Sequence, residues 1–254
     1  MENIVYRKIV YLTIDDGPSI DMKKKVDFLL FKKIPAVFFC RGDFLKKFSN
    51  YAEYAIMNGF IIGNHSYNHH RFSDLNLKMA FEEIKKTDEI IEKIYKKAGV
   101  LRPLRVFRFP YGDKGGINKK KIQDILLDLG YRQPKFQGIT YDWYKNKGLH
   151  KDKDISWTYD IEEYKMDNRD MLFNRIKEFD PDNISSMLKA SSNEILLVHD
   201  HVKTTEVFFK IIEKISQMKL EFRLPDCNLE YRTNIFAKCQ NIIQNLKRNL
   251  ISHR

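Results

Sequence analysis

The sequence predicts a single α/β domain folded as a distorted (β/α) barrel of about seven strands. Short apolar segments alternate with longer segments whose apolar residues recur at helical spacing, as in parallel strands joined by helices. No internal linker interrupts this alternation, which favours one closed or partly closed barrel over two domains. Polar clusters follow several of the apolar segments, at the strand ends where barrel active sites collect.

The first half of the chain supplies three strand and helix pairs. Gly17-Pro18 marks a turn after the first strand, and Asn58-Gly59 ends the second helix before the third strand. Helical spacing is clearest before Gly99, which provides a C-terminal stop. The expected strands are Ile9–Ile14, Ala36–Phe39 and Phe60–Ile62, and the expected helices are Met22–Phe31, Phe44–Met57 and Leu77–Ala98.

The second half repeats the alternation. The expected strands are Val106–Phe109, Ile155–Tyr159 and Ile195–His199, and the expected helices are Lys119–Leu129, Met171–Phe179 and Thr205–Met218. After Pro225 the chain is short and basic, and we expect a final strand or loop and then a helix from Asn234 packed on the barrel. The sequence therefore predicts a main domain at 1–225 and a basic C-terminal segment at 226–254.

The charge balance is basic, with 45 Lys and Arg against 34 Asp and Glu and a formal net charge of +11. Most lysine clusters, such as Lys119 to Lys121, lie on expected helices, where a solvated face is expected. No basic run is interleaved with aromatic residues, so we expect no nucleic-acid partner; a steep salt dependence of oligonucleotide binding would argue otherwise. The three cysteines, Cys40, Cys227 and Cys239, have no C-x-x-C spacing and complete no disulfide framework.

The N-terminal residues Met1 to Lys8 carry charges and contain no apolar region of a signal peptide. No stretch approaches the roughly 18 apolar residues of a membrane-spanning helix. We therefore expect a cytoplasmic protein without a membrane span, unless the sequence is a trimmed form of a secreted protein.

The first polar cluster, T-I-D-D-G-P at Thr13–Pro18, ends an apolar strand with two adjacent carboxylates. Burying carboxylates is costly unless a cation or hydrogen bonds compensate. On an extended backbone the two side chains point in opposite directions, so one could bind a metal while the other faces a substrate. A strand-end turn with capping aspartates is the alternative.

The second cluster, H-S-Y-N-H at His65–His69, follows the third strand. Histidines four positions apart on a helical turn share a face, as in many zinc sites, although a structural pair explains the spacing equally well. Together with a carboxylate they would form a three-ligand site with open positions for water and substrate. His70 lies off that face and is expected to be a bystander.

Three further clusters follow later strands. In R-F-P-Y-G at Arg108–Gly112, the arginine could pair with a catalytic carboxylate, and the turn could aim a backbone N–H into the site. The other two lie at Trp157–Tyr164 and at Leu196–Asp200, which contains His199. Taken singly, the arginine also fits an ordinary strand exit and His199 a buried core or rim residue.

In this order, the five clusters resemble the motifs of the polysaccharide deacetylase family, carbohydrate esterase family 4, which includes the nodulation-factor deacetylases. Thr13–Pro18 corresponds to T-[FY]-D-D-G-P, His65–His69 to H-[ST]-x-x-H, Arg108–Gly112 to R-x-P-[YF]-G, and Leu197–His199 to L-x-H. Pro35–Phe39 is similar to the family's second strand, and the resemblance spans Val10 to Asp200. It implies that 1–225 is a polysaccharide deacetylase-like catalytic domain.

The fourth motif departs from the family pattern. The family often has W-x-x-D-x-x-D-W, and the same spacing here holds Trp157, Asp160, Glu163 and Tyr164. Because a buried guanidinium needs its donors satisfied, we expect Arg108 to contact Asp160 or Glu163 as well as Asp15. Asp160 is preferred, since it requires no substitution within the motif.

The resemblance implies a metal site. Asp16, His65 and His69 would hold one divalent ion, most simply zinc, with cobalt and nickel as alternatives. The ion would polarise an acetyl carbonyl and lower the pKa of a water molecule. The implied activity is a metal-dependent hydrolysis that removes the N-acetyl group from an N-acetylated poly- or oligosaccharide and gives acetate and a free amine.

The resemblance also implies the remaining roles. Asp15 would be the general base, held in place and kept ionised by Arg108, and the backbone N–H of Tyr111 would stabilise the oxyanion. His199 would protonate the departing amine. Residues expected to line or support the substrate groove are Pro110, Trp157, Asp160, Glu163 and Leu197, with the aromatic segment 141–144 as an alternative groove set.

Two other functions remain open at this point. A related hydrolase could act on a formamide or a cyclic imide, which a narrow pocket with little aromatic lining would favour. A carbohydrate-binding module could keep the metal without catalysis. The presence of Asp15, Arg108 and His199 argues against such a module, because binding alone needs neither base nor acid.

Overall fold

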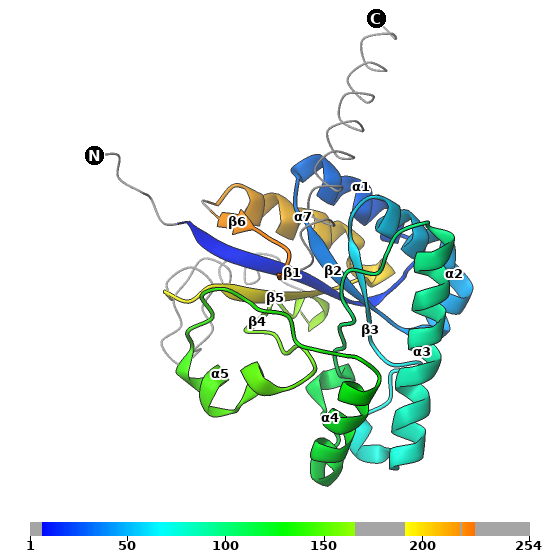
Figure 1. Ribbon diagram of the computed structural model, residues 1–254. Coiled ribbons are helices and arrows are strands. Elements are labelled where there is room, and N and C mark those ends of the chain that lie inside the picture. The colour runs from blue at the N-terminus through cyan, green and yellow to red at the C-terminus, as the bar shows by residue number, and fades with distance from the viewer. Residues whose placement is uncertain (1–6, 166–190, 219, 227–254) are drawn as a thin grey trace, which may run out of the picture.

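Parallel strands form the centre of the protein in the computed structural model, in which residues 7–165, 191–218 and 220–226 are described (Figure 1). The strands are β1 (Lys8–Gly17), β2 (Ala36–Cys40), β3 (Ile61–Asn64), β4 (Tyr159–Asp160), β5 (Glu194–His199) and β6 (Leu220–Phe222). They lie in the order β3-β2-β1-β5-β4, and β6 pairs with the start of β1. All of these pairings are parallel, so the carboxyl ends of the strands meet at one edge.

Backbone hydrogen bonds continue the sheet beyond its two outer strands. Asn64, at the end of β3, forms an isolated parallel bridge with Phe107. The N–H of Ile155, just before β4, donates to the carbonyl of Phe107 at 2.8 Å. These contacts link β3 to the segment that leads into β4, so the expected distorted (β/α) barrel is confirmed. The strands expected at 106–109 and 155–159 are reduced to the bridge and to the two residues of β4.

Helices surround the sheet (Figure 1). They are α1 (Met22–Lys32), α2 (Gly42–Met57), α3 (Leu77–Lys97), α4 (Lys119–Asp128), α5 (Asp142–Asn146) and α7 (Thr205–Ser216). In α3, the Asn76 side chain caps the first turn by accepting from the N–H of Met79, and one face buries Ala80, Ile84 and Ile91. Helices α7, α1, α2, α3 and α4 contact one another in that order around the barrel.

Alternating side chains of β1 enter two different apolar clusters. Val10, Leu12 and Ile14 pack with residues of the surrounding helices. Ile9 and Tyr11 pack inside the barrel with residues from the other strand segments. This alternation places Thr13 and Asp15 on the inner side at the carboxyl end of β1.

Several expectations differ from the structure. Strand β6 and helix α5 were not expected, and the expected helix 171–179 and most of the segment 226–254 lie outside the described residues. The aromatic segment 141–144 does not line a groove at the carboxyl edge. Tyr141 and Tyr144 are buried in the inner cluster, and the Tyr141 hydroxyl donates to Glu194, the first residue of β5 at the opposite edge. None of the described helices is long and apolar enough to span a membrane.

Candidate metal centre and active site

Asp16, His65 and His69 converge at the carboxyl edge of the sheet. Each offers a ligand atom, and these atoms all lie within 4.8 Å of one another. Asp16 Oδ1 lies 2.9 Å from His69 Nε2 and 3.5 Å from His65 Nε2. The geometry therefore brings together the three residues that the sequence marked as metal ligands.

A bulge at the end of β1 explains how adjacent aspartates face different neighbours. The register with β2 shifts between Asp15 and Gly17, so Asp16 is the extra residue, and its φ is 66°. A left-handed conformation costs a non-glycine residue roughly 1–2 kcal/mol, and bulges are common where a side chain must be re-aimed. The bulge turns Asp16 toward the histidines, while Asp15 keeps its pairing with Phe39 and His199.

Neighbouring groups orient both histidine rings. His65 Nδ1–H donates to the carbonyl oxygen of Arg108 at 2.8 Å, and His69 Nδ1 lies 3.2 Å from the Tyr111 hydroxyl oxygen. The first contact places the proton of a neutral His65 on Nδ1 and leaves Nε2 as a ligand atom, which is how metal-binding histidines are commonly held. The Glu83 carboxylate fixes the loop between them by accepting from the backbone N–H groups of Tyr67 and Asn68.

The Asp16 carboxylate fits a cation. Its Oδ1 atom is buried and has no hydrogen-bond partner in the described part of the chain, although two imidazole nitrogens face it. Burial opposes ionisation of Asp16, but the hydrogen bond from His201 and the interactions with the His65 and His69 imidazoles outweigh it and hold the pKa well below its usual value. An ionised oxygen facing two imidazole nitrogens matches the donor set of a divalent transition metal.

Arg108 pairs with Asp15 inside the barrel. Its Nη1 donates to Asp15 Oδ1 at 2.9 Å and to Thr13 Oγ1 at 2.7 Å, and its Nε donates to the carbonyl oxygen of Ile155 at 3.0 Å. Both side chains of the ion pair are almost fully buried. The guanidinium thus fixes one oxygen of Asp15, while the other lies 3.7 Å from His65 Nε2.

The expected contact of Arg108 with Asp160 or Glu163 is wrong. Among the described residues Arg108 has no carboxylate partner besides Asp15, and its Nη2 has no hydrogen-bond partner. The fourth motif follows β4, which pairs with β5, so its acids lie beside His199. Two other contacts take the place of the second carboxylate. Arg108 Nε donates to the carbonyl of Ile155, and the guanidinium carbon lies 4.4 Å from the centre of the Phe39 ring.

Glu163 holds His199 instead. Glu163 Oε1 accepts from the backbone N–H of His199 at 2.6 Å and lies 3.2 Å from Nδ1 of the same residue. Burial disfavours the charged imidazole, but the hydrogen bond and charge of Glu163, with the charges of Asp15 and Asp16, raise the pKa of His199 to about 9. Burial also raises the pKa of the neighbouring Asp160 to about 6. Asp160, Glu163 and His199 form a second group of potential ligand atoms, but the Glu163–His199 ion pair accounts for it without a metal.

The remaining predicted residues form the walls around these groups. Tyr111 is 57% exposed, its ring lies 4.6 Å from that of His69, and its backbone N–H has no partner among the described residues. A side chain at Gly112, where φ is 65°, would lie 2.9 Å from the Trp157 ring, so glycine permits the close approach of the turn to that ring. Pro110 and Leu197 are both buried.

Sequence reasoning missed His201. Its Nε2–H donates to Asp16 Oδ2 at 2.8 Å, on the carboxylate oxygen opposite to the one that faces His65 and His69. The spacing contained a signal, because residues two positions apart on an extended chain point to the same side, and His199 was already assigned to the site. The rings of His199 and His201 stack with centroids 5.4 Å apart.

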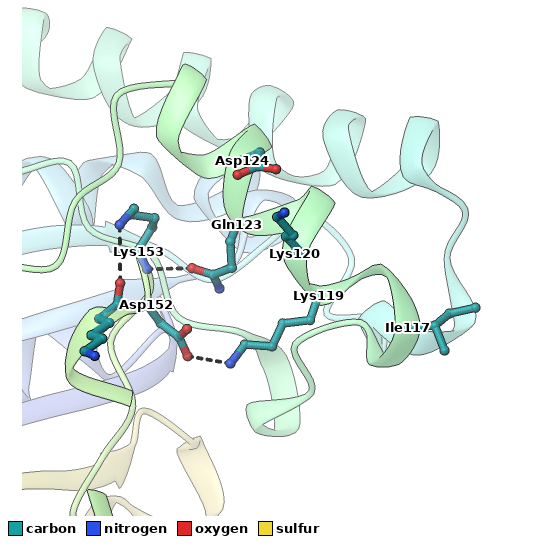
Figure 2. A pocket seen from close by; sticks show the side chains of 8 residues that line it. Ile117, Lys119, Lys120, Gln123, Asp124, Asp152 and Lys153 are labelled. Atoms are coloured by element: carbon teal, nitrogen blue, oxygen red, sulfur yellow. Dashed lines mark hydrogen bonds and ion pairs between the residues drawn. The ribbon is translucent and has the colours of Figure 1, made fainter. Parts of the chain in front are cut away.

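A hollow beside α4 is lined by none of these residues. Figure 2 shows that its lining is Ile117, Lys119, Lys120, Gln123, Asp124, Lys151, Asp152 and Lys153. Lys119 pairs with Asp152 at 3.0 Å, and Lys114 pairs with Asp152 at 2.7 Å and with the buried Asp154 at 2.8 Å. Lys119 and Asp152, two of the charged residues that line the hollow, are therefore held in ion pairs, and we interpret this part of it as a structural network.

Fold and site define a class of protein: a (β/α) barrel with an Asp-His-His group that could hold a metal ion, a buried aspartate paired with arginine and a histidine paired with glutamate. The family description "Polysaccharide deacetylase" matches residues 3–134, and the chain belongs to this family.

Similar proteins include the peptidoglycan-N-acetylmuramic acid deacetylase PdaC of Bacillus subtilis, 26% identical over 212 residues, which cover 83% of this chain and 36% of that protein. The chain thus spans about a third of that relative's length. A family 4 carbohydrate esterase from Streptomyces lividans, solved with acetate, has a TM-score of 0.61 at 19% identity and covers 86% of this chain and 98% of its own. A family 4 pseudoenzyme from Bacillus anthracis has a TM-score of 0.61 at 22% identity and covers 85% of this chain and 63% of its own. At these identities the two structures establish the fold alone.

Proposed function

We propose that the protein is a metal-dependent hydrolase that removes the acetyl group from an N-acetylated sugar of a poly- or oligosaccharide. The observation that carries the proposal is the arrangement around Asp16. The Asp15–Arg108 pair lies beside the metal group, and the Glu163–His199 pair lies on the neighbouring strand end. The name of the Bacillus subtilis relative, an N-acetylmuramic acid deacetylase, supports the same class of substrate.

Asp16, His65 and His69 would hold the ion, and one carboxylate with two imidazoles suits zinc, while cobalt and nickel also accept these donors. Bound there, a divalent ion supplies Lewis acidity to the acetyl carbonyl and to water. Asp15 accepts the proton of the attacking water, and Arg108 keeps its carboxylate in place through the 2.9 Å contact. The free N–H of Tyr111 is a donor for the oxygen that becomes negative as water adds to the carbonyl carbon.

Cleavage of the C–N bond requires a proton at nitrogen, because an amide anion is a very poor leaving group. His199 holds that proton, since Glu163 raises the pKa of its imidazole to about 9 despite burial. Nδ1 faces Glu163, and Nε2 has no partner among the described residues. Nε2 therefore donates to the departing amine, and the products are acetate and the free amino sugar.

The test is release of acetate from a panel of N-acetylated saccharides by zinc-loaded protein, with formamides and cyclic imides as further arms. Asp15→Asn and His199→Ala should each lower the rate by about 10²- to 10⁴-fold, the usual effect of losing a general base or acid. Release from the saccharides alone supports the proposal. Saccharide binding without any hydrolysis would assign the chain to a non-catalytic role, and hydrolysis of the other amides alone would assign a different substrate class. The cytoplasmic location stays a prediction.

A further inference from the structure

His201 lies beside the metal group but is not one of its members. Three ligand atoms, from Asp16, His65 and His69, form the group, and the imidazole of His201 contacts Asp16 from the opposite side. We propose that His201 is a positioning residue that fixes the Asp16 carboxylate, so that one oxygen is bound by imidazole and the other is presented to the metal. This inference rests on the metal site of the proposed function and adds a residue that none of the recognised motifs contains.

The two oxygens of Asp16 have different neighbours. Oδ2 accepts from His201 Nε2–H at 2.8 Å, whereas Oδ1 faces His69 Nε2 at 2.9 Å and has no hydrogen-bond partner in the described residues. Asp16 is also the extra residue of a bulge with a φ of 66°, so regular strand pairing does not hold its backbone in place. Without the His201 contact, the carboxylate is free to rotate about its final bond and to offer either oxygen.

His201 is itself held by a buried network. The Nζ of Lys25, whose side chain is fully buried, donates to Asp200 Oδ1 at 2.6 Å and to the carbonyl oxygen of His201 at 3.1 Å. Asp200 also accepts from the backbone N–H and the hydroxyl of Ser19, each at 2.7 Å. These buried hydrogen bonds connect the loop after β5 to the loop after β1. They therefore hold the backbone of His201 in place where its side chain contacts Asp16.

Groups that orient a metal ligand without touching the metal typically contribute about 10- to 100-fold to metal affinity. His201→Ala should therefore weaken Zn²⁺ binding by about that factor. His201→Gln should retain most of the affinity, because a glutamine amide nitrogen reaches nearly the position of imidazole Nε2 and can donate to Oδ2. A residue that bound the metal directly would not be replaced by glutamine in this way.

The experiment is a Zn²⁺ titration of each protein against a chromophoric chelator, without substrate. His70→Ala is the matched control, because His70 is exposed, adjoins His69 and forms no hydrogen bond or ion pair among the described residues. The absorption spectrum of the Co²⁺ form provides a second readout, since a reoriented carboxylate alters the ligand field. Thermal unfolding of the metal-free variants establishes that each one is folded.

The expected order of affinity is wild type and His70→Ala together, His201→Gln close behind, and His201→Ala weakest with an altered Co²⁺ spectrum. Wild-type affinity in folded His201→Ala would overturn the proposal. Equal weakness of His201→Gln and His201→Ala would also overturn it, because the donated hydrogen bond would then not be the cause. A wild-type protein that binds Zn²⁺ but hydrolyses no acetyl amide would contradict the proposed function and leave this inference standing.

Discussion

His65 and His199 lie at the same edge of the sheet and have different partners. His65 Nε2 faces Asp16, whereas His199 lies against Glu163. His65→Ala removes a proposed metal ligand and should release most of the zinc together with the activity, and excess zinc should partly restore both by mass action. His199→Ala should keep its zinc, lose activity by about 10²- to 10⁴-fold, and gain nothing from added zinc.

Zinc content and acetate release, measured on both variants with and without added zinc, separate the two roles. Loss of zinc from His199→Ala, or full activity of that variant on an amide, would contradict the assignment of His199 as the acid.

The alkaline limit of activity should depend on Glu163. Burial lowers the pKa of His199, and the Glu163 hydrogen bond and charge raise it to about 9 in the metal-free protein. Only protonated His199 can donate, so activity should fall as the pH rises through its pKa. Glu163→Gln removes the largest raising contribution, so this limb of the pH profile of kcat/KM should move to lower pH.

A bound cation also opposes protonation of His199, so in the metal-loaded enzyme the alkaline decline of activity should be centred below pH 9. The quantity to measure is therefore the difference in the position of this decline between wild type and Glu163→Gln. Glu162→Gln is the control, because Glu162 pairs with Lys165 at 2.8 Å. Identical alkaline limbs in Glu163→Gln and wild type would mean that Glu163 does not tune the acid.

At the scale of elements, one buried ion pair ties helix α1 to the loop after β5. Lys25 and Asp200 are both fully buried, and breaking a buried pair from one side typically costs about 3–5 kcal/mol because the other charge stays buried. Lys25→Met should lower the free energy of unfolding by roughly that amount, measured by urea denaturation. Lys24→Met, on the same helix, should change it little, because the Lys24 side chain is 70% exposed where it pairs with Asp21. Equal stability of the two variants would show that the pair does not stabilise the loop.

Helices were more predictable than strands, because the signals that define a helix lie within its own segment of sequence. The spacing of apolar residues and the stop at Gly99 define α3 within the helix itself, and its observed range, Leu77–Lys97, differs by one residue from the expected one. A strand depends on partners far away in sequence. The apolar run at 106–109 therefore gave no indication that it forms a single bridge to Asn64, and β6 pairs with a strand about two hundred positions earlier.

At the scale of the whole molecule, the metal group was predictable because parallel strands end at one edge, which brings Asp16 and His65 together regardless of their separation in sequence. The partner of Arg108 was not predictable in this way. Which acid meets which base depends on the order of strands in the sheet. Strand β4 pairs with β5, so Asp160 and Glu163 lie beside His199 and not beside Arg108. The contact of His201 with Asp16 likewise depends on a bulge that the letters D-D-G-P do not encode.

Metal binding should stabilise the whole barrel, because the proposed ligands come from the end of β1 and the loop after β3 and are apart in the unfolded chain. A ligand that binds only the folded state at 100 times its Kd contributes about 2.7 kcal/mol. For a domain of this size each kcal/mol raises Tm by roughly 2–4 °C, so zinc should raise Tm by roughly 5–10 °C and a chelator should reverse the change. Calorimetry of the wild type, His65→Ala and His199→Ala, each with and without zinc, tests this. The shift should be present in wild type and His199→Ala and nearly absent in His65→Ala, because only the last lacks a ligand. An equal shift in His65→Ala would place the stabilising ion elsewhere on the protein and contradict the Asp16, His65 and His69 site.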